Sequence, residues 1–131
     1  MCIQVLKPEL ADSLSETFTC YKVLFKVLDG RFRTPHFKRY LKVGINKSRG
    51  AMSRLFYYVT PFDIKDYKPG FHAYLRLKDA RKHYNHFDIQ NNKLIMKCTA
   101  KKSDLNAIGG TNFRPKSITV AVNNLTLIEE V

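Results

Sequence analysis

The feature that most constrains the fold of this chain is a series of short runs rich in β-branched and aromatic residues, each ended by a turn signal. The run at residues 20–27 (CYKVLFKV) is closed by Asp29-Gly30, and the run at residues 55–60 (LFYYVT) is stopped by Pro61. Such runs predict a sheet of short strands. Further strands are expected at residues 71–75, 94–99, 117–122 and 125–128.

Residues 37–43 predict another strand with two different faces. Phe37, Arg39, Leu41 and Val43 alternate with Lys38, Tyr40 and Lys42, so one face is largely apolar and the other is cationic with a tyrosine. The flanking segments lack this alternation. We expect a basic turn or arm at residues 30–35, an exposed loop at 44–54 and, within residues 63–70, a turn that ends in Pro69-Gly70.

Helical patterns are few. Residues 8–16 predict one short helix within an N-terminal cap (1–19), and residues 78–86 predict an amphipathic helix, because Leu77, Ala80 and Tyr84 are spaced by three to four. Residues 104–108 are expected to form a single helical turn. No internal repeat or linker divides the sequence. We therefore expect one α+β domain over residues 1–131, a mainly antiparallel β-sheet with one or two short helices packed on it.

The charge of the chain is concentrated in residues 30–62, which contain eight basic residues and no Asp or Glu, so that they contribute +8 to a net charge of +12. Aromatic residues are interleaved with the cations. This mixture is typical of a nucleic-acid-binding surface, because cations neutralise phosphates and ring faces stack on bases. A basic face that only maintains solubility is the alternative, although such faces normally mix both signs. The predicted binding residues are Arg31, Arg33, Lys38, Arg39, Lys42, Lys47, Arg49, Arg54 and Tyr40, with residues 30–54 as the basic arm.

Motifs for catalysis or metal binding are weak by comparison. His83 and His86 are three residues apart, but a zinc site would need further ligands such as Cys98 or Asp88. His72 alternates with apolar neighbours and is expected to be packed or to face the surface with a backbone partner. No nucleophile elbow, phosphate loop or zincin motif is present. We therefore expect no catalytic residue, no metal and no cofactor.

The cysteines and the N-terminus bear on location. Cys2, Cys20 and Cys98 are odd in number and far apart, which favours reduced thiols over a disulfide framework. The first residues lack a charged region followed by an apolar core, and no window approaches eighteen apolar residues. A cytoplasmic protein without a membrane partner is the expectation.

Two stretches carry a resemblance to a known group of proteins. Cys20-Tyr21-Lys22-Val23, followed by Gly70-Phe71-His72-Ala73-Tyr74 and Lys78-Asp79-Ala80, resembles small uncharacterised proteins encoded by bacteriophages and mobile elements, over roughly residues 20–128. The chain departs from them in its basic insertion and its N-terminal extension. The resemblance implies a phage origin and the host cytoplasm, where small single-domain proteins often act against host defence. It implies no catalytic residue.

Three functions remain open from the sequence. The first is a non-enzymatic protein that binds RNA or DNA through the basic arm. The second is a phage counter-defence inhibitor, similar to an anti-CRISPR protein, that binds a host defence protein, a nucleoprotein complex, its guide RNA or a nucleotide messenger. The third is a small nuclease or transferase built around His72. A defined complex with one host assembly would indicate the second function. Turnover at substoichiometric protein would indicate the third.

Overall fold

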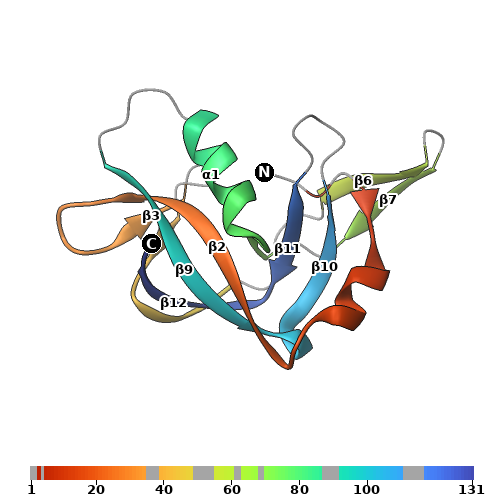
Figure 1. Ribbon diagram of the computed structural model, residues 1–131, viewed down its shortest axis with the longest axis horizontal. Helices are drawn as coiled ribbons and strands as arrows, with labels where there is room; N and C mark the ends of the chain where they lie inside the picture. Colours follow the sequence, from red (N-terminus) through yellow and green to blue (C-terminus); the bar gives the residue numbers. More distant parts are fainter. Residues whose placement is uncertain are drawn as a thin grey trace.

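The computed structural model describes residues 3, 5–34, 39–48, 55–60, 63–67, 70–86, 92–110 and 117–131. They form mainly antiparallel strands with one α-helix (Figure 1). Among these residues, no helix is long and apolar enough to cross a lipid bilayer. The elements are β1 (Val5–Leu6), η1 (Pro8–Ser13), β2 (Thr17–Lys26), β3 (Phe32–Arg33), β4 (Tyr40–Leu41), β5 (Gly44–Lys47), β6 (Leu55–Thr60), β7 (Asp63–Tyr67), β8 (Phe71–Tyr74), α1 (Leu77–His86), β9 (Lys93–Lys101), η2 (Lys102–Asp104), β10 (Leu105–Gly110), β11 (Ile118–Val122) and β12 (Asn124–Glu130).

Strands β2 and β9 form the centre of the larger sheet, whose order is β1-β10-β11-β8-β2-β9-β12-β5. Their antiparallel ladder runs from Thr17↔Lys101 to Phe25↔Lys93. Alternate residues of β9 are buried, because successive side chains of a strand point to opposite faces. Figure 1 shows both strands curving across the molecule. The buried side of this ladder is one wall of the core.

Part of the sheet closes on itself. β2 also pairs with β3, and β3 pairs with β4. β4 leads through residues 42–43 into β5, β5 pairs with β12, and β12 returns to β9. With β4 and β5 taken as one bent strand, five strands form a ring, which leaves no open edge within it. The cluster of buried side chains includes Leu24, Leu41, Leu94, Met96, Leu125 and Leu127.

The bend between β4 and β5 is held by Asn46, which is buried. Its side-chain oxygen accepts a hydrogen bond from the backbone N–H of Lys42 (3.1 Å). Its amide nitrogen donates to the carbonyl oxygens of Lys42 (2.8 Å) and Gly44 (3.1 Å). Gly44 has φ +97°, a left-handed conformation that glycine adopts without strain. The bend therefore depends on one buried amide and one glycine.

β2 has two partners along its other edge. Near its middle it pairs with β8 through Tyr21↔Tyr74, and at its end it pairs with β3 through Phe25 and Lys26. From β8 the sheet continues through β11 and β10 to β1. Helix α1 packs against β2 and β9. The edge of β2 thus divides between the ring and the rest of the sheet.

The described residues confirm most of the expected strands and the mainly antiparallel α+β architecture. β2, β6, β8, β9, β11 and β12 lie where strand runs were expected, and α1 covers the expected amphipathic helix. Phe71, predicted to pack inward, is 4% exposed. The N-terminal helix is shorter than expected and is a 3-10 helix.

Several local predictions differ from the structure. Gly44–Lys47 is a strand instead of a loop, because it pairs with β12. Strand β7, which pairs with β6, was not expected within residues 63–70, and Pro69 of the expected turn lies outside the described residues. The helical turn expected at 104–108 is strand β10, which pairs with β11. The predicted arm contains β3. Val43, assigned to an apolar face, is 60% exposed at the bend.

Candidate nucleic-acid interface

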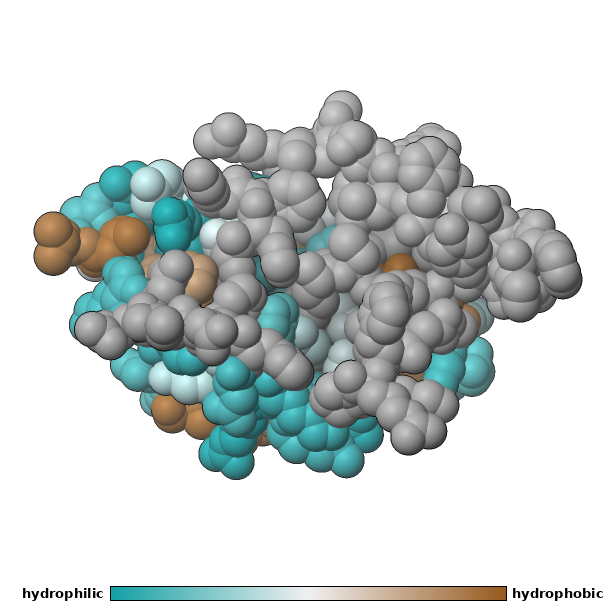
Figure 2. Space-filling view, turned by 90° about the horizontal axis from the view of Figure 1, so that it is seen from above, coloured by the Kyte–Doolittle hydropathy of each residue, from teal (hydrophilic) through white to brown (hydrophobic). Residues whose placement is uncertain are grey.

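A hollow of about 1040 Å³ lies at the hairpin end of the ring, and we call it the hairpin hollow. It is lined by residues 26–31, which connect β2 to β3, by Tyr40 of β4, by residues 92–94 and by Glu130 of β12. The hairpin projects at one end of the molecule (Figure 1), and that end shows a hydrophobic patch beside hydrophilic residues (Figure 2). Leu28, at the hairpin tip, is fully exposed. The hollow thus combines polar and apolar surface.

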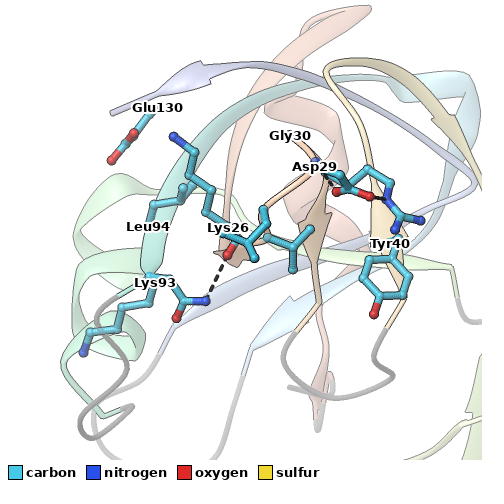
Figure 3. A pocket seen from close by; sticks show the side chains of 11 residues that line it. Lys26, Asp29, Gly30, Tyr40, Lys93, Leu94 and Glu130 are labelled. Carbon is cyan, nitrogen blue, oxygen red and sulfur yellow. Dashed lines mark hydrogen bonds and ion pairs between the residues drawn. The ribbon is translucent and has the colours of Figure 1, made fainter.

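Arg31 and Tyr40 form a stacked pair in the hairpin hollow, where Figure 3 labels Tyr40 and Asp29. The Arg31 guanidinium carbon lies 4.4 Å from the centroid of the Tyr40 ring, and Tyr40 is 51% exposed. Asp29 holds the arginine: Arg31 Nε donates to its Oδ2 (2.5 Å), and the Arg31 backbone N–H donates to its Oδ1 (3.2 Å). That backbone N–H and the guanidinium lower the pKa of the Asp29 carboxyl. The cation and the ring are therefore positioned together.

Two lysines outside the predicted arm also line the hairpin hollow. Lys26 is exposed, and its carbonyl oxygen accepts a hydrogen bond from Asn92 Nδ2 (2.9 Å). Lys93 is turned toward α1. Its ammonium donates to the carbonyl oxygen of Tyr84 (2.8 Å) and lies 4.2 Å from the centroid of the Tyr84 ring. The acids of the lining are Glu130 and Asp29, and Asp29 engages only the Nε side of the Arg31 guanidinium in the hydrogen bonds described above. Lys26 and Arg31 are thus the cations best placed to meet an anion here.

The other two arginines near this end contact the interior. Arg33 lies with its guanidinium carbon 5.4 Å from the ring centroid of buried Phe25, and its Nε is buried without a hydrogen-bond partner among the described residues. Arg39 lies 4.6 Å from the ring centroid of Phe71, and its Nη2 donates to the carbonyl oxygen of Lys47. Both arginines are half-buried. They join ring strands to neighbouring elements as well as carrying charge.

The remaining predicted residues are dispersed. Lys42 is exposed at the bend that Asn46 holds, and Lys47 is exposed on the outer face of β5. Lys38, Arg49 and Arg54 lie outside the described residues. The structure therefore brings together Arg31 and Tyr40 from the predicted set. It adds Lys26 and Asn92, which sequence reasoning missed because only the pairing of β2 with β9 brings them side by side.

The histidines weighed for chemistry have other surroundings. His72 is 5% exposed on β8, and His83 is hydrogen-bonded to the Tyr74 hydroxyl across α1 and β8. Burial, reinforced by the Asp79 charge, raises the pKa of Tyr74. In the described part of the chain, no three His, Cys, Asp or Glu side chains lie close enough to hold a metal ion. The side chain of His86 and the whole of Asp88 are not among the described residues.

The two described cysteines are core residues. Cys20 and Cys98 face each other across β2 and β9, are fully buried and carry free thiols. Burial raises the pKa of the Cys98 thiol to about 12 and also raises that of Cys20. Because the thiolate is the reactive form, both thiols are chemically quiet at neutral pH.

Comparison of the chain with protein-family models, with curated proteins and with solved structures gives no significant match. The geometry itself offers two kinds of contact in the hairpin hollow. Guanidinium and ammonium groups bind phosphate oxygens, and an exposed tyrosine ring accepts a stacked base. Together these contacts suit a ligand that carries both a phosphate and a planar ring.

Proposed function

We propose that the protein binds single-stranded nucleic acid at the hairpin hollow, without catalysing a reaction on it. The observation that carries the proposal is the stacked pair of Arg31 and Tyr40, which Asp29 holds at an exposed, concave surface. The arginine provides the cation for a phosphate, and the tyrosine provides the ring face for a base. The large positive charge of the chain supports the same partner.

Single strands fit this site better than a duplex. A base in a duplex is stacked between its neighbours and presents only its edges, whereas an unpaired base is free to stack on a protein ring. Such stacking is worth about 1–3 kcal/mol per base and depends little on which base is bound. We therefore expect affinity for both RNA and DNA strands, with modest sequence preference.

The experiment is fluorescence anisotropy with labelled dT20 and rU20 over a salt series. Tyr40→Ala should weaken binding about 5- to 150-fold, because a stacking contact of about 1–3 kcal/mol is lost, whereas Tyr40→Phe retains the ring and should bind nearly as wild type. Arg31→Gln should lower the salt slope by about 0.7, the value for one phosphate contact on a single strand. Lys82→Gln, an exposed change on α1, is the matched control.

Two results would overturn the proposal. Failure of the wild-type protein to bind either strand at about 50 mM salt would remove nucleic acid as the partner. Equal binding by wild type and Tyr40→Ala would move the interface away from the hairpin hollow. Gel analysis of the same labelled strands tests the non-enzymatic part, because we expect them to stay intact, with and without a chelator, for wild type and His72→Ala alike.

A further inference from the structure

A second surface on the molecule has the chemistry of a phosphate site. A groove of about 260 Å³ lies on the outer face of β9, β12 and β5, opposite the buried side of these strands. Its lining includes two lysines, three threonines and one asparagine, with Asp104 at one end. The apolar residues of the lining are Ile45 and Ala100. We call this surface the threonine groove.

Strand register places the polar groups of the threonine groove in two adjacent rows. Thr99 of β9 lies opposite Thr126 of β12. Continuing this register by two residues beyond the paired positions places Lys101 opposite Asn124, and Asn124 is paired with Lys47 of β5. The two lysines are therefore two strands apart, about 10 Å between their backbones. A row of hydroxyls lies beside them.

We propose that the threonine groove is a second phosphate site for the strand that occupies the hairpin hollow, so the inference rests on the proposed function. Lys47 and Lys101 lie on either side of β12 with exposed side chains, long enough to converge on a phosphate above it. Thr99 and Thr126 donate hydroxyl hydrogen bonds to the same group. A lining with few apolar residues and two ammonium groups complements a phosphodiester rather than an apolar ligand.

The acid in the groove offsets only part of this charge. Asn124 Nδ2 donates to Asp104 Oδ1 (3.1 Å), so the carboxylate is engaged by a neighbouring amide at the groove's end. The two lysines outnumber it. The lining as a whole is therefore positive.

The two surfaces are connected by strands that they share. β12 begins at Asn124 in the threonine groove and ends at Glu130 in the hairpin hollow, and β9 runs between the same two places in the opposite direction. At about 3.3 Å per residue the separation is roughly 20 Å. Sites of this extent match the 4 to 16 nucleotides that a small nucleic-acid-binding barrel typically covers.

The test is a double variant, Lys47→Gln with Lys101→Gln, measured with labelled dT20 over a salt series. Loss of two phosphate contacts should reduce the salt slope by about 1.4 and weaken binding on the order of tenfold at 50 mM salt. Lys78→Gln with Lys82→Gln removes the same charge from exposed positions on α1 and should stay within about twofold of wild type. Lys47→Arg with Lys101→Arg should restore most of the affinity, because the charge is kept.

Three results separate the two proposals. If wild type does not bind dT20, the proposed function is wrong, and so is the inference that the threonine groove binds phosphate. If Arg31→Gln weakens binding but the Lys47/Lys101 double variant matches the α1 control, the function stands and the groove is not a phosphate site. If the double variant does not fold, amide chemical shifts of wild type decide: dT20 should shift Thr99 and Thr126, and unmoved signals would overturn the inference.

Discussion

The ammonium of Lys22 donates a hydrogen bond of 2.5 Å to the backbone carbonyl oxygen of His72, inside the protein. Lys22 belongs to the buried face of β2, between Cys20 and Leu24, and is 7% exposed. β8 pairs with β2 only through Tyr74, and His72, two residues earlier in the chain, pairs with Ala121 of β11. The lysine thus links β2 to β8 beyond their single paired position, where the edge of β2 divides between β8 and β3.

The burial of Lys22 makes the stability of the protein depend on pH. Burial lowers the pKa of Lys22 to about 8, whereas an unfolded lysine titrates near 10.4. Between these values the unfolded chain binds a proton that the folded chain has released, so Lys22 contributes a free energy of unfolding that rises with pH. The difference between wild type and Lys22→Met should therefore grow by on the order of 3 kcal/mol from pH 7.5 to 10.5.

Urea unfolding at several pH values measures this difference. Comparison with the variant is needed because the raised pKa values of Cys20 and Cys98 act in the opposite sense: their thiols stay protonated in the folded chain while those of the unfolded chain ionise. Lys26→Met, an exposed lysine on the same strand, should follow the wild-type curve. Parallel curves for Lys22→Met and wild type would show that Lys22 is solvated.

Arg39 and Arg31 should differ in their effect on stability. Arg39 lies over the ring of buried Phe71 and donates to the carbonyl oxygen of Lys47, so Arg39→Ala should cost about 1–3 kcal/mol. Arg31 is exposed, and Arg31→Ala should change stability by less than about 0.5 kcal/mol. Urea midpoints of the two variants give the comparison. Equal urea midpoints would mean that the contacts of Arg39 with Phe71 and Lys47 do not stabilise the protein.

Phe71 is the core anchor of β8. It is 4% exposed and belongs to the main buried cluster, so Phe71→Ala should cost about 3–5 kcal/mol. Leu28→Ala, at the fully exposed hairpin tip, provides the matched control and should leave the urea midpoint nearly unchanged. A small effect of Phe71→Ala would contradict its place in the core.

Gly70 should not tolerate a side chain. A Cβ at this position would lie 2.4 Å from the carbonyl oxygen of Val122, a backbone atom that cannot move without disturbing the pairing of β8 with β11. Gly70→Ala should therefore destabilise the protein by about 3 kcal/mol or more. Gly30→Asn is the control, because nothing lies near that position and asparagine accepts its positive φ. Thermal melting of both variants is the measurement. A lower melting temperature for Gly70→Ala alone would show that Gly70 is required because a side chain does not fit there.

Sequence reasoning succeeded where the signal is local. The β-branched run that forms β2 and the helical spacing of α1 are patterns among residues that are close together in the sequence. β5, β7 and β10 were missed because glycine, asparagine and charged residues are poor strand formers, and their strands exist through pairing with β12, β6 and β11.

The residues of the candidate site were likewise predictable only where the signal is local in the sequence. The basic, aromatic composition of residues 30–62 pointed to Arg31 and Tyr40, which the structure brings together. It did not reveal that Arg33 and Arg39 stack on Phe25 and Phe71, because that depends on contacts between distant strands. Lys101 was missed for a related reason: its relation to Lys47 appears only when β9, β12 and β5 are aligned.

The ring of strands also sets the order in which the molecule can assemble. β12 is the partner of both β5 and β9, so the ring closes only when residues 124–130 join segments about 80 and 30 residues earlier in the chain. Contacts of such long sequence separation form late and slowly, because the intervening loops must first be closed. Until then β5 and one edge of β9 are unpaired and open to other strands. The interval before β12 docks is therefore when the chain is most exposed to aggregation, and a chaperone that shields β-edges should raise its folding yield.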